Sequence, residues 1–179
     1  MMDFIKIAMK DPKVGAFTAS SQYVARKIAR KIKSGQKCII EYGAGDGVIT
    51  RELLNRLSPD GRLIAFELNK DFLLKLKTII DPRLSVINDD VVALPEHLKV
   101  FGVEKIDVVV SGIPFSFLKP ALRDHIIQNT HNALREGGMF IVYQYSPMVF
   151  PLLKKYFTFT QLHFELINFP PYFIMIAEK

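Results

Sequence analysis

The sequence predicts one doubly wound α/β domain that spans residues 1–179 and is built on a seven-stranded, mostly parallel sheet. Five apolar runs alternate with helix-like segments, which is typical of consecutive βαβ units. Two further runs, Phe157–Glu165 and Tyr172–Ala177, close the chain and are expected to pair antiparallel. Hydrophobic residues make up 49% of the 179 residues, so the chain can bury a sizeable core.

The N-terminal stretch contains two candidate amphipathic helices. Phe4–Lys10 mixes apolar and basic residues, and it is either an anchor at a lipid interface or a short helix that closes the core. Ser20–Lys33 has helical periodicity, with Ser20 or Ser21 as N-cap. Its apolar positions are Val24, Ala25, Ile28, Ala29 and Ile32, and its basic positions are Arg26, Lys27, Arg30, Lys31 and Lys33. Such a helix either lies on an anionic surface or packs on the core with its basic side in water.

The first predicted strand ends in a glycine-rich turn, Glu41–Gly47, which leads into a helix beginning at Val48. Cys38 stands at the head of this strand and is expected to be a small buried residue, since the chain has no second cysteine. Glycine is favoured where a turn needs positive φ or where the backbone approaches a ligand. A dinucleotide-binding turn needs a third glycine at the position that Val48 occupies. The G-x-G-x-G spacing instead resembles motif I of class I S-adenosylmethionine (SAM) methyltransferases.

Acidic residues follow the next two predicted strands. Glu67 ends the strand Arg62–Phe66, where a carboxylate can accept both hydroxyls of a ribose. Asn88–Asp90 follows the strand Leu84–Ile87 and can address an adenine amino group. These three strand ends predict a SAM site, with S-adenosylhomocysteine as the product, under a basic helical segment formed by residues 1–34. The candidate cofactor-binding residues are Ser20, Ser21, Glu41, Gly43, Ala44, Gly45, Gly47, Glu67, Leu68, Asp89, Asp90, Val91, Ser111, Gly112 and Ile113.

The second half of the chain is expected to supply the acceptor side of the site. Glu96–Val103 is polar and is predicted to be turn-like, and Lys105–Val110 is a fully buried strand. The loop Ser111–Phe117 follows that strand and should face the SAM methyl group, with Phe115 or Phe117 as a wall. A helix, Ala121–Arg135, is expected to stop at the glycine pair 137–138, before a fifth strand, Met139–Tyr145.

Four segments together resemble the bacterial phospholipid N-methyltransferases, which convert phosphatidylethanolamine stepwise to phosphatidylcholine. The segments are Val14–Ser21, Glu41–Gly47, Ser111–Phe115 and Asn168–Pro171. The same residues also resemble the ribosomal RNA adenine dimethyltransferases. In that group a polar residue and a tyrosine stand where this chain has Ser111 and Phe115, and a small C-terminal helical domain follows that has no counterpart here. Both differences favour the lipid family, and the resemblance implies a Rossmann-like class I fold.

Methyl transfer requires a neutral nitrogen placed in line with the sulfonium carbon, so the expected work of the enzyme is positioning and exclusion of water. The candidate catalytic residues are Ser111, Pro114, Phe115 and Tyr145. Tyr145 is a possible proton acceptor or relay, with Tyr143 and Tyr23 as rivals, and the alternative for each tyrosine is a wall or core position. The ring of Phe115 could hold a cationic headgroup.

Charge and composition limit the partners. The formal net charge of +6 favours an anionic partner, either a membrane surface carrying an amine-bearing phospholipid or RNA. The four histidines have no ligand spacing, so no metal site is expected, and no protein partner is inferred. Without a signal peptide or an apolar run of about 18 residues, the protein is expected to be cytoplasmic or peripheral on the inner face of the membrane. The alternatives to a lipid enzyme are an RNA adenine methyltransferase and a SAM-binding module without catalysis.

Overall fold

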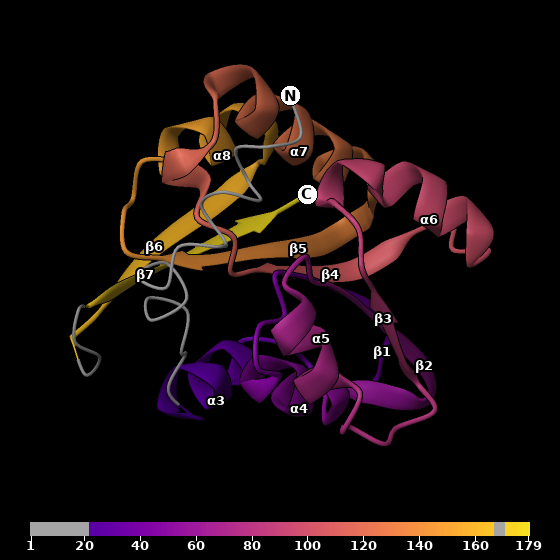
Figure 1. Ribbon diagram of the computed structural model, residues 1–179. Coiled ribbons are helices and arrows are strands. Elements are labelled where there is room, and N and C mark those ends of the chain that lie inside the picture. The colour runs from indigo at the N-terminus through magenta and orange to yellow at the C-terminus, as the bar shows by residue number, and fades with distance from the viewer. Residues whose placement is uncertain (1–21, 167–170) are drawn as a thin grey trace.

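A computed structural model describes residues 22–166 and 171–179, and these residues form one seven-stranded sheet in the order β3-β2-β1-β4-β5-β7-β6 (Figure 1). Neighbouring strands are parallel except where β7 pairs antiparallel with β5 and β6. The strands are β1 (Gln36–Tyr42), β2 (Leu57–Phe66), β3 (Leu84–Ile87), β4 (Ile106–Ser111), β5 (Leu134–Gln144), β6 (Phe159–Glu165) and β7 (Tyr172–Glu178). The α/β prediction with its closing antiparallel pair is confirmed.

Helices cover both faces of the sheet (Figure 1). They are α3 (Gln22–Arg30), α4 (Val48–Leu54), α5 (Lys70–Leu76), α6 (Leu94–Val100), α7 (Pro120–Ala133) and α8 (Phe150–Tyr156). Helices α3 and α4 share one apolar cluster with the sheet, and α6, α7 and α8 share a second cluster on the opposite face. In β1, Ile39 belongs to the first cluster and Ile40 to the second, and both are fully buried. This burial on both faces explains why the central strands are nearly continuous apolar runs.

The amphipathic segment near the N-terminus packs on the core. In α3 the side chains of Val24, Ala25 and Ile28 are fully buried against α4 and the sheet. The packing of its apolar side on the core is confirmed, its basic residues are exposed or half-buried, and their contact with an anionic surface stays a prediction. The predictions for Phe4–Lys10, and those for Ser20 and Ser21, lie outside the described residues.

Two predictions in the second half of the chain were wrong. Residues 94–100 form α6 rather than a turn, because Pro95 stands in its first turn, where a missing N–H costs nothing. Helix α7 ends at Ala133, before the glycine pair, because Leu134 is already extended. Gly137 then takes a φ of +69° within β5, and its N–H donates to the carbonyl of Lys179.

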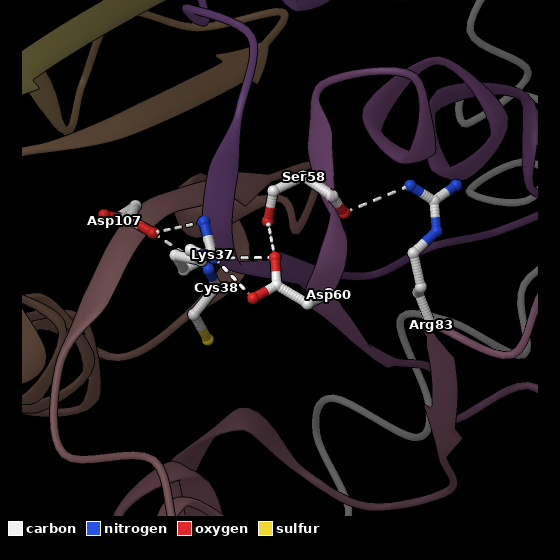
Figure 2. A network of polar contacts seen from close by, with 6 residues as sticks. All are labelled: Lys37, Cys38, Ser58, Asp60, Arg83 and Asp107. Atoms are coloured by element: carbon white, nitrogen blue, oxygen red, sulfur yellow. Dashed lines mark hydrogen bonds and ion pairs between the residues drawn. The ribbon is translucent and has the colours of Figure 1, made fainter.

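A polar network joins the amino ends of three neighbouring strands (Figure 2). Asp107 at the start of β4 accepts hydrogen bonds from the backbone N–H groups of Lys37 (2.8 Å) and Cys38 (2.9 Å) in β1. Its other carboxylate oxygen accepts from Arg135 Nε at 2.6 Å. On β2, Asp60 accepts from Ser58 and from the Lys37 ammonium. The network therefore lies at the opposite edge of the sheet from the strand ends that carry the glycine turn.

Cys38 is 6% exposed, and burial raises the pKa of its thiol to about 12, so the thiol stays protonated. This confirms the prediction of a small buried side chain. Among the helices of residues 22–166, none is both long and apolar enough to cross a membrane.

We expect Asp107→Asn to lower the free energy of unfolding by about 1–3 kcal/mol at neutral pH, because two backbone donors and Arg135 lose their charged partner. Burial alone would raise the pKa of Asp107, but these hydrogen bonds hold it below its usual range. The stabilisation is therefore present above the usual carboxyl pKa of about 3.9 and is lost as pH falls through the lower folded value. Urea unfolding at neutral and acid pH measures both effects.

The control is Asp60→Asn, since the side chain of Asp60 is 70% exposed. We expect a much smaller loss at neutral pH, because exposed ion pairs contribute little. Equal losses in the two variants would contradict the role assigned to Asp107.

Candidate active site

The turn between β1 and α4 needs glycine for two separate reasons. Gly43, Gly45 and Gly47 have φ angles of +72°, +57° and +84°, which disfavour any other residue. A Cβ at Gly47 would also lie 2.8 Å from the side chain of Ile79, whereas a Cβ at Gly45 would meet no atom within 4 Å. The space beside Gly45 is therefore open on the side where a ligand can approach the backbone.

Glu67 holds this turn in place. One carboxylate oxygen accepts the N–H of Gly45 at 2.8 Å and the other accepts the N–H of Asn69 at 2.7 Å. Glu67 is only 2% exposed, and this burial raises its pKa although both hydrogen bonds oppose the shift. The sequence predicts a ribose contact for Glu67, and that contact stays a prediction. The fastening of the glycine turn is an additional role that the sequence did not reveal.

Glu41 is fully buried at the end of β1. The hydroxyl of Thr50 donates to its Oε2 at 2.7 Å, while Oε1 has no hydrogen-bond partner. Burial raises the pKa of Glu41 to about 8, with a smaller contribution from the nearby carboxylate of Glu67. Glu41 therefore holds a proton at neutral pH. Its hydrogen bond with Thr50 links the end of β1 to the first turn of α4, the two elements that flank the glycine turn.

The residues after β3 are fixed by contacts with their neighbours. Asp90 caps the short 3₁₀ helix Val91–Ala93 by accepting the N–H of Val92 at 3.0 Å. Asp89 contacts the ring of His97 in α6 at 2.9 Å, a hydrogen bond that lowers the pKa of Asp89. Sequence reasoning missed His97, because its helix was predicted to be a turn. Val91 is buried, at 8% exposed, and its contact with the cofactor stays a prediction.

The ends of β2 and β3 are also joined directly. Asn88 donates its side-chain amide to the carbonyl oxygens of Glu67 at 2.9 Å and Leu68 at 3.3 Å. The three strand ends that the sequence analysis grouped therefore lie at one edge of the sheet. The adenine contacts expected of Asp89 and Asp90 remain predictions.

A cavity of about 180 Å³ connects the glycine turn to the ends of β4, β5 and β7. It is lined by Gly43, Ala44, Gly45, Asp46, Ile49, Gly112, Pro114, Ser116, Phe117, Tyr143, Gln144, Tyr145 and Tyr172. The expected loop after β4 is therefore present, but three of its residues, Ser111, Ile113 and Phe115, do not line the cavity. Ser111 is fully buried, with no partner for its hydroxyl among the described residues, and Ile113 packs under Gly43.

The sequence predicts a cavity wall formed by Phe115 or Phe117, and for Phe115 that prediction was wrong, because only Phe117 lines the cavity. Phe115 belongs to the short 3₁₀ helix Phe115–Phe117, and its ring is fully buried against Phe140 in the core. Its backbone N–H donates to the side chain of Gln144 at 3.1 Å. Phe117 lines the cavity and is 56% exposed.

Three tyrosines form the far wall of the cavity. The rings of Tyr145 and Tyr172 are stacked with centroids 4.3 Å apart, and their hydroxyls are 2.6 Å apart. Tyr143 meets Tyr172 edge-on at 6.2 Å. Burial raises the pKa of Tyr145 above its usual value, so at neutral pH it is a phenol and a poor proton acceptor. Tyr23, the other rival, lies on α3 beside Lys27 and does not line this cavity.

The position of the Tyr143 side chain requires a glycine at position 112. A Cβ at this position would lie 2.1 Å from the hydroxyl oxygen of Tyr143 and 2.5 Å from the ring carbon that bears it. Real side chains do not approach so closely, so an added methyl group would displace the tyrosine. Tyr172 was absent from the predicted site, because its strand is far from the glycine turn in the sequence.

These residues fit SAM. The open space beside Gly45 accommodates close approach of a ligand, and the cavity continues from there to an aromatic wall where an acceptor can meet it. The fold and the site together define a class of protein, the class I SAM-dependent methyltransferases, and SAM is the cofactor. Among residues 22–166 and 171–179 no group of three or more metal-ligating side chains occurs.

Comparison with known proteins supports the same class of protein. The Methyltransferase domain family matches residues 39–138, more than half of the chain, and the chain belongs to that family. An ornithine lipid N-methyltransferase from Singulisphaera acidiphila is 29% identical over 162 residues, covering 88% of this chain and 84% of the relative. The crystal structure of Aeropyrum pernix fibrillarin with natively bound SAM shares the fold, with a TM-score of 0.64 at 17% identity over 90% of this chain and 76% of that one.

A relative that acts on RNA matches less completely. Ribosomal RNA small subunit methyltransferase A from Acidobacterium capsulatum is 30% identical over 134 residues. The match covers 73% of this chain and 45% of that enzyme, so this chain spans less than half of its length.

We expect Gly45→Ala to weaken SAM binding by at least about tenfold, because the new methyl group occupies the open space beside the turn. The matched control is Gly102→Ala, since Gly102 has a φ of +63° and its Cβ would likewise meet no atom within 4 Å. Both variants should lose about 1 kcal/mol of stability from backbone strain. Calorimetric titration with SAM and thermal unfolding separate the two effects. Equal SAM affinity in the two variants would contradict the assignment of the cofactor site.

We expect Glu41→Gln to change how stability depends on pH. With a folded pKa near 8, Glu41 costs the native state more stability as pH rises from about 4.3, the unfolded value, and the cost is complete above about 8. Glutamine does not titrate, so the melting temperature of the wild type should fall relative to the variant between about pH 5 and about pH 9. Glu52→Gln in α4 is the control, because the side chain of Glu52 is 27% exposed and pairs with Arg26 at 3.5 Å. Parallel curves for wild type and Glu41→Gln would refute the raised pKa.

Proposed function

We propose that the protein transfers the methyl group of SAM to the amine nitrogen of a membrane lipid, phosphatidylethanolamine or a similar aminolipid such as ornithine lipid. The observation that carries this proposal is the cavity that runs from the glycine turn to an aromatic wall. Phe117 lines this cavity and is also 56% exposed, so apolar surface continues from the cavity to the outside. A lipid could present its headgroup there while its acyl chains stay in a bilayer.

The extent of the match to the ornithine lipid enzyme supports the proposal. It covers 88% of this chain, more than the family match to residues 39–138. The similarity therefore extends beyond the cofactor half of the fold toward the strands that build the acceptor wall. Peripheral contact with an anionic membrane is part of the proposal, and the net charge of +6 and the outward basic residues of α3 support it.

The chain's contribution to the reaction is mainly positional. When bound, SAM supplies an activated methyl group that a neutral nitrogen can attack in line. Ile49 and the glycine turn border one side of the cavity, and Pro114 and the tyrosines border the other, so an amine placed between them is held near the cofactor and away from bulk water. Because burial raises the pKa of Tyr145, this residue is a phenol at neutral pH and a poor acceptor for the ammonium proton.

RNA is the second candidate acceptor. The outer side of α3 forms a shallow basic hollow lined by Tyr23, Arg26, Lys27, Arg30 and Lys31, which suits a phosphate backbone. The match to the RNA enzyme leaves more than half of that protein without a counterpart. The loop after β4 also offers buried Ser111 and Phe115 where an adenine would need a polar group and an exposed ring.

The experiment is incubation with labelled SAM and, in separate reactions, vesicles of phosphatidylethanolamine with an anionic lipid, vesicles of ornithine lipid, and ribosomal RNA. We expect label in a lipid amine, identified by mass, and none in RNA. At subsaturating SAM, Gly45→Ala should lower the yield of product by at least about tenfold, as its weaker SAM binding requires, and this ties the activity to the cavity. Label in RNA with none in either lipid would overturn the proposal and select the RNA candidate.

A further inference from the structure

We propose that Tyr143, Tyr145 and Tyr172, together with Phe117, recognise the positive charge of the acceptor headgroup through the faces of their rings. The inference rests on the proposed function and narrows its acceptor to an alkylammonium, including the quaternary ion that full methylation produces. All four side chains line the one cavity that also contains the glycine turn. The nitrogen that receives the methyl group would lie beside them.

The geometry of the wall keeps the rings in fixed and different orientations. Tyr145 and Tyr172 are stacked at an interplanar angle of 24°, and their hydroxyls are joined by a hydrogen bond. Tyr143 is turned 62° from Tyr172 and is held against Gly112. Rings at two inclinations can surround a compact cation from more than one side, as stacked rings alone cannot. Phe117 adds an apolar ring at the mouth.

The charge of the cavity also suits a cation. Among its described lining residues Asp46 is the one charged side chain, and none is lysine, arginine or histidine. The electron-rich faces of tyrosine and phenylalanine attract alkylammonium ions, with an effect of about 2- to 30-fold in affinity for each favourable ring. The attraction grows when the ion is removed from water, and the tyrosines here are buried or half-buried.

Ring faces suit stepwise methylation better than hydrogen bonds do. In each transfer a nitrogen–carbon bond forms as the sulfur–carbon bond breaks, S-adenosylhomocysteine is released, and the nitrogen becomes positively charged. It must lose a proton to water before a further round, so the number of N–H donors falls each time. A site that bound the nitrogen through hydrogen bonds from its N–H groups would lose affinity for the acceptor after each round. A site that binds the positive charge would keep its affinity. Such a wall can serve the first methylation and the last.

The test uses choline and its uncharged carbon isostere, 3,3-dimethylbutan-1-ol, as probes on protein saturated with S-adenosylhomocysteine. The chain has no tryptophan, and three of its six tyrosines line the cavity, so a change in tyrosine fluorescence on binding is one readout and calorimetry provides an independent affinity. We expect choline to bind at least about tenfold more tightly than the isostere. Equal affinities would overturn the proposal. Choline binding only when S-adenosylhomocysteine is absent would also overturn it, because the wall would then serve the cofactor.

Variants separate the contribution of the ring faces from that of the tyrosine hydroxyls. Tyr145→Phe keeps the ring and should keep the preference for choline, whereas Tyr145→Leu should lose most of it. Phe117→Leu lies at an exposed position that tolerates change, and it should reduce the preference without lowering the melting temperature. Its matched control is Phe159→Leu, an aromatic residue that is 46% exposed at the far end of β6.

Two further results would count against the proposal. Loss of the preference in Tyr145→Phe would assign recognition to the hydroxyl. Loss in Asp46→Asn, with retention in Tyr145→Leu, would assign it to the carboxylate. Methylation of lipid without a choline preference would refute this inference and leave the proposed function intact. A choline preference with label only in RNA would refute the proposed function instead.

Discussion

The site depends on the hydrogen bond between the carboxylate of Glu67 and the N–H of Gly45. A turn with three left-handed glycines has many alternative conformations, and its open backbone cannot define a ligand site unless something fixes it. Glu67 supplies that constraint from the end of the neighbouring strand, and Asn69 fixes the second carboxylate oxygen. Burial of this carboxylate is costly and is offset only because both oxygens are hydrogen-bonded. The position of β2 beside β1 therefore determines the shape of the turn.

The antiparallel strand β7 completes the acceptor side. The parallel strands bring the turn, the loop after β4 and the end of β5 to one edge of the sheet. β7 enters between β5 and β6 and places Tyr172 against Tyr145, although 27 positions separate them in the sequence. The wall therefore depends on the pairing of β7 with β5, whereas the hydrogen bond that fixes the glycine turn comes from the end of β2, next to β1.

The sequence was sufficient for features governed by local rules. Strand alternation, the glycine turn and the acid after β2 all follow from periodicity and backbone preference, and the structure has each of them. Features that depend on packing between distant elements were not predicted from the sequence. Phe115 and Phe117 are two positions apart and both aromatic, but the first points into the core and the second into the cavity. His97 and Tyr172 depend on contacts between distant elements, which no local pattern contains.

Gly112 and Tyr143 constrain each other sterically. The hydroxyl of Tyr143 already occupies the volume that any side chain at position 112 would need. A lineage could gain a residue at position 112 only after position 143 had become smaller, and such a step would open the wall of the cavity at the same time. Divergent enzymes with the same fold should therefore vary these two positions together, and an alignment would show them as a covarying pair that marks a change of acceptor.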